Sequence, residues 1–349
     1  MIALLIAGSV AMAVSLFGTR FLIGFFRSRG KGQPILGPED RGPDHQHKAG
    51  TPTMGGLAIL GSAVIGYLVA HFRRGAYFSD HAMFMIAGIG AMAGLGFLDD
   101  FLKVQRSHNR GVLWKKKGWI TLGMSFLIAI LMVSFTKIDT RIGLTRADRP
   151  GWELGKVGWV LWAGLIIFST VNAVNVTDGL DGLAAGSAIL GFFAFTIIAF
   201  WGLRNPTIYP FIINPFDISI LAVALGGACV GFLWWNAAPA RIIMGDVGAL
   251  GLGAALALLA LATNTSLLLP LVCLLNVIEI GSVALQMGSY KLFNKRRIFR
   301  MTPIHHHFEL VGWPETTVVI RFWIVAGLFT ALGLGLYYAD FVSLPGVLD

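Results

Sequence analysis

The chain is a succession of long apolar segments separated by short polar stretches. Most apolar segments approach the roughly 20 residues that a helix needs to cross a hydrocarbon core about 30 Å thick. The eighth and ninth lie so close together that they can also be taken as one long span. The pattern predicts an all-α, polytopic membrane protein with about ten transmembrane helices, at residues 2–26, 54–72, 82–98, 119–135, 158–174, 183–203, 218–235, 249–264, 266–286 and 318–338.

Composition supports this interpretation. Hydrophobic residues make up 56% of the chain and charged residues 13%, and the mean hydropathy is +0.73, whereas soluble domains are about 25% charged. The first apolar segment continues into FFRSRGK without a small-residue cleavage site, so we expect it to be retained as a helix. The longest polar stretch, residues 27–53, is rich in proline and glycine and predicts a loop. A single membrane domain is therefore expected over residues 1–349.

Basic residues are distributed unevenly among the predicted loops. The first, third, fifth, seventh and ninth loops together hold 17 Lys and Arg residues, and the other four hold 8. The positive-inside rule then places the odd-numbered loops in the cytoplasm and both termini outside. The net charge of +9 is thereby explained mainly by topology, which argues against a nucleic-acid partner. Cys229 and Cys273 fall in the middle of predicted spans, so core packing is expected rather than a disulfide framework or a metal site.

Five polar stretches, all on odd-numbered loops, are dense in acids, amides, glycine and histidine. Such groups are costly beside hydrocarbon, and their recurrence from loop to loop predicts a functional site. We therefore expect a membrane-embedded active site on the cytoplasmic face. The stretches are GTPTMGG at 50–56, LDDFLK at 98–103, NAVNVTDGLDG at 172–182, NAAPARIIMGDVGAL at 236–250 and MTPIHHHFE at 301–309.

Carboxylates in three of these stretches predict a cation site. Asp99 and Asp100 end an apolar run at headgroup depth, where carboxylates repel a lipid phosphate unless a cation or a proton mediates. Two solvated acids at a helix end would give the same local pattern. Asp246 is the acid of the seventh loop and is flanked by glycines. Because magnesium prefers one or two carboxylates together with substrate phosphates, converging acidic loops favour Mg²⁺ as the cofactor.

The third stretch combines acids with amides. Asp178 and Asp181 are three residues apart and share one face if a helix begins here, although an acid at a helix N-terminus is also favourable for the helix dipole alone. Asn172 and Asn175 lie just upstream. Amides, acids and glycines this close together are suited to a polar ligand that the backbone approaches closely.

Three consecutive histidines, His305 to His307, stand in the fifth stretch. On a helix they point about 100° apart and cannot all bind one metal, which argues against a zinc site. Phosphate binding, proton transfer or structural hydrogen bonding are the expected roles.

Three further ionisable residues leave two interpretations open. Lys48 and Lys117 can each bind a phosphate as a point charge, or simply belong to the positive-inside count. Glu279 lies within the ninth apolar segment and is expected to face the protein interior. It suits helix bracing and catalysis equally well.

Taken together and in this order, GTPTMGG, LDDFLK, NAVNVTDGLDGLA, NAAPARIIMGD and PIHHHFE resemble the phospho-N-acetylmuramoyl-pentapeptide-transferases, within the polyprenyl-phosphate N-acetylhexosamine-1-phosphate transferase superfamily. The resemblance spans nearly the whole chain. It implies transfer of phospho-N-acetylmuramoyl-pentapeptide from UDP to undecaprenyl phosphate, with Mg²⁺, to give lipid I and UMP at the bacterial cytoplasmic membrane. The sequence leaves open whether the chain forms a homodimer.

The resemblance also implies roles for individual residues. Asp246 matches the magnesium ligand, and Asp99 matches the acid proposed to deprotonate the lipid phosphate. The catalytic candidates are Asp99, Asp100, Asp178 and His305. The substrate-binding candidates are Lys48, Lys117, Asn172, Asn175, Asp181, Asn236, Ile243, His306 and His307.

The chain departs from the family pattern at three positions near the expected nucleotide pocket. Ile243 stands where an aromatic residue usually stacks on uracil, Ala238 replaces a usual Tyr, and Ala249 replaces a usual Ser.

The sequence leaves two alternatives to this function open. A related transferase would use UDP-GlcNAc or another UDP-sugar, and a lipid transporter would also place polar groups in the membrane. The transporter is disfavoured because the acids gather at one interface.

Overall fold

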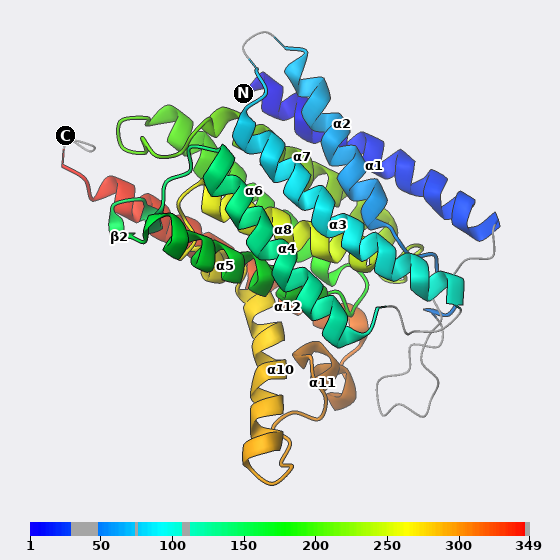
Figure 1. Ribbon diagram of the computed structural model, residues 1–349. Coiled ribbons are helices and arrows are strands. Elements are labelled where there is room, and N and C mark those ends of the chain that lie inside the picture. The colour runs from blue at the N-terminus through cyan, green and yellow to red at the C-terminus, as the bar shows by residue number, and fades with distance from the viewer. Residues whose placement is uncertain (29–47, 74–75, 107–111, 346–349) are drawn as a thin grey trace.

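The computed structural model describes residues 1–28, 48–73, 76–106 and 112–345 and consists mainly of long helices (Figure 1). In chain order the elements are α1 (Ile2–Ser28), α2 (Gly56–His71), α3 (Asp80–Arg106), α4 (Trp114–Phe135), β1 (Arg141–Arg146), β2 (Arg149–Glu153), α5 (Gly155–Thr177), α6 (Leu183–Arg204), α7 (Pro215–Asn236), α8 (Gly245–Ala262), α9 (Leu269–Val272), α10 (Leu274–Leu292), α11 (Ile304–Val311) and α12 (Glu315–Val342).

Within the described residues, eight helices are long and apolar enough to cross a membrane: α1, α3, α4, α5, α6, α7, α8 and α12. This confirms the predicted class of a helical, polytopic membrane protein. The other two predicted spans differ in form. α2 is apolar but only 16 residues long, and the segment predicted at 266–286 is divided into α9 and α10, which leaves the bundle at a steep angle (Figure 1).

Helix α8 occupies the centre of the bundle. Its sequence after Asp246 contains only glycine and aliphatic residues, and a helix that is apolar on all sides is buried on all sides. In α8, 89% of the span is buried, compared with 33% in each of α1, α4 and α12. α8 packs against α2, α3, α5, α6 and α7. The first turn of α8, which carries Asp246, is therefore surrounded by the ends of other helices.

The start of α1 and the end of α12 lie at one end of the bundle, and the described parts of the polar stretches lie at the other (Figure 1). α1 and α7 run parallel, because Gly8 approaches Val223 near the start of both helices and Trp235 Nε1 donates to the Leu16 carbonyl at 2.7 Å further along. Which end of the bundle faces the cytoplasm stays a prediction from the basic residues.

A two-stranded antiparallel hairpin, β1–β2, lies at the end of the bundle where α12 finishes and was not expected from the sequence. It is attached to the last turns of α12 through Asp340. Thr145 Oγ1 donates to Asp340 Oδ2 at 2.7 Å, and Arg149 Nη1 lies 2.6 Å from Asp340 Oδ1. The strands are five and six residues long and irregular in register, so they leave little periodicity to detect.

Labelling of introduced cysteines tests the orientation. We expect Arg297→Cys to react with a membrane-impermeant maleimide only from the cytoplasmic side, and Asp148→Cys only from the outside. Cys229 and Cys273 are buried, so the unmodified chain serves as a low-background control. Labelling of both introduced cysteines from the same side would contradict the predicted topology.

Candidate active site

Backbone hydrogen bonds bring the first and fourth polar stretches together at the start of α8. Ile243 N donates to the Pro52 carbonyl at 2.8 Å, and Gly55 N donates to the Ile243 carbonyl at 3.0 Å. A third bond of 2.9 Å joins Gly56 N to the Met244 carbonyl. The loop before α2 thus runs alongside the loop before α8, although the two are far apart in the sequence.

The second stretch joins them because α3 approaches the start of α8 very closely. A Cβ added to Gly96 would lie 2.2 Å from the Asp246 carbonyl oxygen, so this crossing requires glycine. One turn later on α3, Asp100 Oδ2 accepts a hydrogen bond of 3.2 Å from Val247 N. A carboxylate is favourable at that position because the first amides of a helix lack partners within the helix.

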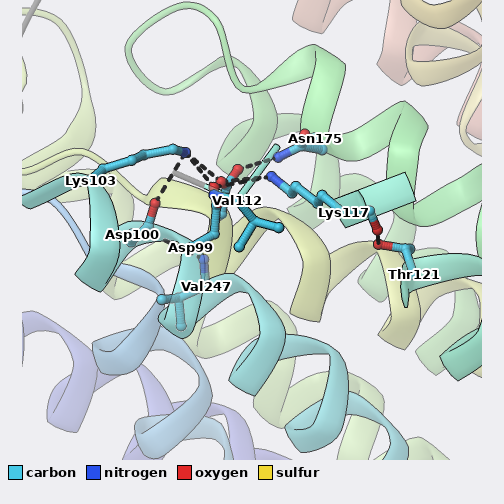
Figure 2. A network of polar contacts seen from close by, with 9 residues as sticks. Asp99, Asp100, Lys103, Val112, Lys117, Thr121, Asn175 and Val247 are labelled. Carbon is cyan, nitrogen blue, oxygen red and sulfur yellow. Dashed lines mark hydrogen bonds and ion pairs between the residues drawn. The ribbon is translucent and has the colours of Figure 1, made fainter. Parts of the chain in front are cut away.

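Asp99, Asp100 and Asp246 form a buried cluster with two lysines. Figure 2 shows Asp99, Asp100, Lys103 and Lys117 of this cluster. One oxygen from each acid lies within 4.8 Å of the others. Lys103 Nζ is 2.7 Å from Asp99 Oδ2 and 3.6 Å from Asp100 Oδ1, and it also contacts Asp246 Oδ2. Lys117 Nζ lies 2.7 Å from Asp246 Oδ2 and 3.4 Å from Asp99 Oδ2. Three carboxylates facing two ammonium groups leave one negative charge uncompensated when all are ionised.

Lys103 belongs to this cluster and was not singled out from the sequence. It stands four residues after Asp99 and three after Asp100, which places all three on one side of α3. That spacing was available in LDDFLK, but the same spacing occurs in many exposed helical ion pairs. The contact with Asp246, which lies 143 residues away in the chain, is what distinguishes Lys103.

The third stretch reaches the cluster from the end of α5. Asn175 Nδ2 donates to Asp246 Oδ1 at 2.6 Å, so the two oxygens of Asp246 face different partners. Asp178 follows directly after α5. Removal from solvent, and then the negative charges of Asp246 and Asp100, raise the pKa of Asp178 well above its usual value. An acid in this environment gains a favourable partner when a cation or a positively charged group approaches.

Asp181 belongs to a neighbouring ion cluster. α6 begins at Leu183, so Asp178 and Asp181 both lie in the connecting loop and do not share a helix face. Lys48 Nζ lies 2.9 Å from Asp181 Oδ1 and 2.6 Å from Glu315 Oε1. Glu315, in the first turn of α12, also accepts a hydrogen bond of 2.8 Å from Asp181 N. Glu315 was not singled out from the sequence, because nothing local indicates that α12 begins beside Lys48.

The two remaining amide candidates of the third and fourth stretches, Asn236 and Asn172, form hydrogen bonds with the protein backbone. Asn236 accepts from Gly182 N at 3.1 Å and donates to the Ile242 carbonyl at 3.0 Å, so it joins the loops around Asp181 and Ile243. The Ile243 side chain is half-buried. Asn172 Nδ2 donates to the Phe168 carbonyl of its own helix at 2.7 Å, so within the described part of the chain this amide binds its own helix and not the acidic cluster.

The three histidines have separate partners on α11, as their helical spacing predicts. His305 is buried, and its Nδ1 lies 2.9 Å from Glu279 Oε2 on α10. His306 Nδ1 lies 2.7 Å from Glu309 Oε2. His307 Nδ1 accepts a hydrogen bond of 3.1 Å from Arg300 N. Each imidazole therefore contacts a different part of the protein.

The acidic cluster fits a hard divalent cation. Its donors are carboxylate oxygens with an amide beside them, and such donors suit Mg²⁺, Ca²⁺ or Mn²⁺ rather than metals that prefer nitrogen or sulfur ligands. Asp246 would hold the ion, and Asp99 and Asp100 lie close enough to add to the negative charge around it. Lys103 and Lys117 contact the same carboxylates, so the ion and the ammonium groups compete for these oxygens, and the lysines become available to bind phosphate.

Comparison with known proteins identifies the family. Residues 82–264 match the model "Glycosyl transferase family 4", and residues 48–60 match signature 1 of the phospho-N-acetylmuramoyl-pentapeptide-transferases. A phospho-N-acetylmuramoyl-pentapeptide-transferase of Frankia alni is 44% identical, over 97% of this chain and 98% of the relative. Proteins of the same name from Frankia casuarinae and Cutibacterium acnes are 43% and 40% identical, over 98% and 97% of this chain and 99% of each relative. The chain is therefore an enzyme that belongs to the phospho-N-acetylmuramoyl-pentapeptide-transferase family of phosphoglycosyl transferases.

Proposed function

We propose that this enzyme transfers phospho-N-acetylmuramoyl-pentapeptide from UDP to undecaprenyl phosphate, with release of UMP and formation of lipid I. The reaction is placed at the cytoplasmic face of the bacterial cytoplasmic membrane. The observation that carries the proposal is the buried cluster of Asp99, Asp100 and Asp246 with Lys103 and Lys117. Phosphoryl transfer depends mostly on positioning and on neutralising charge. This cluster provides charges of both signs at the end of α3 and the start of α8.

Each part of the site has a role in this proposal. Mg²⁺, when bound by Asp246 and its neighbours, supplies neutralisation of phosphate charge. Lys103 and Lys117 bind phosphate oxygens as point charges. Asp99 accepts the proton of the incoming lipid phosphate, since a carboxylate at headgroup depth can act as a base. Asp178, adjacent to the cluster, favours a cation or an additional proton at the same place.

The nucleoside is proposed to bind beside the second ion cluster. Asp181, Lys48 and Asn236 are polar groups that can form hydrogen bonds with a uracil ring, and Ile243 lies in the loop that Asn236 holds. Ala240 N donates to Asp181 Oδ2 at 2.9 Å, so the same loop fixes both the acid and the residue expected to cover the base. Asn172, Asn175, His306 and His307 remain candidates for contacts with the sugar and the phosphates.

Release of UMP tests the proposal. We expect the purified enzyme to release UMP from UDP-N-acetylmuramoyl-pentapeptide only when undecaprenyl phosphate and Mg²⁺ are both present. Release with UDP-GlcNAc instead would identify the related transferase. Lipid flux across vesicles without release of UMP would identify the transporter. Exchange of labelled UMP without lipid phosphate would indicate a covalent intermediate rather than direct attack.

Substitution of Ile243 by phenylalanine tests the nucleoside site. Isoleucine covers one face of a base but lacks a π-system, and aromatic pairs gain roughly 0.5–1.5 kcal/mol beyond area burial. Ile243→Phe should therefore tighten binding of the UDP substrate by about two- to tenfold, as measured by calorimetry. Turnover at saturating substrate should change little, because the contact is the same in the ground and transition states.

Ile243→Leu is the matched control, since it changes shape without adding a π-system. Its affinity should stay close to that of the unchanged enzyme. Weaker binding by the phenylalanine variant, or a large fall in saturated turnover, would show that Ile243 does not cover the base.

A further inference from the structure

Glu279 and His305 form a pair that is fully enclosed by protein. Both side chains have 0% exposure, and His305 Nδ1 lies 2.9 Å from Glu279 Oε2. Ile304, which precedes His305, packs against an apolar cluster that includes Leu180 and Leu275. Burial of two ionisable groups in such surroundings is costly unless they bind each other well. The pair is therefore a specific feature of the site and needs an explanation.

One atom of each partner has no hydrogen-bond partner among the described residues: His305 Nε2 and Glu279 Oε1. The position of His305 Nε2 is informative, because a Cβ added to Gly179 would lie only 2.3 Å from it. Gly179 stands between Asp178 and Asp181. The Nε2 side of the imidazole, which Glu279 does not contact, therefore lies against the loop that carries these two acids.

The contact with Glu279 determines where the imidazole carries its proton. A carboxylate accepts hydrogen bonds, so Nδ1 must donate, and the neutral ring then keeps a lone pair on Nε2. A carboxylate that fixes the tautomer and orientation of a histidine in this way occurs in catalytic triads and behind metal-bound histidines. Without the carboxylate, the ring can place its proton on either nitrogen.

We propose that Glu279 is a positioning residue that holds His305 in the Nδ1–H form, with Nε2 directed at the loop of residues 178–181. This inference rests on the proposed function, in which that loop contributes Asp178 and Asp181 to the site. Glu279 acts only through His305. Other polar groups of α10 have their own partners: Asn276 Nδ2 donates to Thr177 Oγ1 at 3.0 Å, and Ser282 Oγ donates to the Glu279 carbonyl at 2.7 Å.

The experiment combines Glu279→Gln with a spectroscopic measurement of the tautomer. Glutamine has the same size but can present either an oxygen or an NH₂ group to Nδ1. We expect kcat to fall by about tenfold or more, the lower end of the loss when a group that orients a functional side chain is changed, with the KM for both substrates within about twofold of the original. In ¹⁵N spectra of histidine-labelled protein, His305 should change from a single Nδ1–H form to a mixture. His305→Gln identifies its signals.

Ser282→Ala is the control for a general disturbance of α10, since it removes a neighbouring buried hydrogen bond that does not reach His305. We expect its turnover to stay within about twofold of the original, as is usual for loss of a single weak hydrogen bond. Because the pair acts as a unit, the double variant Glu279→Gln, His305→Gln should be no slower than His305→Gln alone.

The outcomes distinguish the two proposals. A Glu279→Gln enzyme with turnover and tautomer unchanged overturns the positioning role. If that variant fails to fold, the unchanged protein decides, because an Nε2–H form of His305 in its spectrum also overturns the role. If the unchanged chain releases no UMP while its spectrum shows Nδ1–H and the variant shows a mixture, the proposed function fails and the positioning role is supported.

Discussion

Replacement of Asp246 by asparagine is expected to lower turnover by about 100-fold or more while leaving the fold intact. Asp246 is the acid that contacts Lys103, Lys117 and Asn175 at once, so it stands at the centre of the cluster. Asparagine keeps the size and one carbonyl oxygen, and Asn175 can still donate to it. The change removes the negative charge that a divalent cation requires, and loss of one preorganised electrostatic group typically costs 10²–10³ in rate.

The measurement is UMP release at increasing Mg²⁺ concentration, together with the midpoint of thermal unfolding. Asp246→Asn should need more Mg²⁺ for half-maximal rate and should unfold at nearly the same temperature. Asp148→Asn is the matched control, because it makes the same change at an exposed acid of the hairpin. If Asp246→Asn retained more than about a tenth of the original turnover, a loss of only ~1.4 kcal/mol, Asp246 would not be the metal ligand.

The sequence predicted which loops carry the candidate site, because charged and polar side chains are costly beside hydrocarbon. Stretches dense in acids and amides recur at one set of predicted helix ends in a chain that is mostly apolar. Asp99, Asp100 and Asp246, from two of the three acidic loops, come together in the structure. Their individual roles stay predictions, since geometry alone does not separate a base from a metal ligand.

The pairing of charges could not be predicted from the sequence. Lys48 and Lys117 fitted the positive-inside count as well as phosphate binding, and neither Lys103 nor Glu315 was singled out. Lys103 and Lys117 contact Asp246 across 143 and 129 residues of sequence, and Lys48 contacts Glu315 across 267 residues. No local spacing contains that information. Close crossings such as that at Gly96 decide which loops meet, and one glycine among 44 gives no signal of its own.

Burial of an acid does not by itself indicate a functional site. Asp217 is buried at the start of α7, at the end of the bundle opposite the five stretches. It accepts hydrogen bonds from Ser79 Oγ at 2.6 Å, Ser79 N at 2.8 Å and Tyr67 OH at 3.1 Å, and it lies 2.9 Å from His71 Nε2. These contacts engage both of its oxygens and join α2, α3 and α7. The acidic cluster differs because its main partners are two flexible lysines that can turn to a substrate.

Replacement of Lys103 by glutamine should separate cation binding from turnover. Lys103 contacts all three acids of the cluster, and a divalent cation needs the same oxygens. Removal of one ammonium group therefore leaves more negative charge for the cation, and the Mg²⁺ concentration needed for half-maximal rate should fall. Turnover should nevertheless fall by about 100-fold, as for other losses of a preorganised charge-assisted donor, because a phosphate-binding point charge is lost. This direction of the Mg²⁺ effect is opposite to that expected for Asp246→Asn.

Lys116→Gln provides the matched control for this last prediction. Lys116 lies in the first turn of α4, beside Lys117, but its side chain is exposed. Loss of its charge should change turnover and the Mg²⁺ requirement by no more than about twofold, since exposed charges in high dielectric contribute little. A Lys103→Gln enzyme that needs more Mg²⁺ would show that Lys103 supports the cation site instead of competing with it. Turnover equal to that of Lys116→Gln would show that Lys103 compensates buried charge without contacting the substrate.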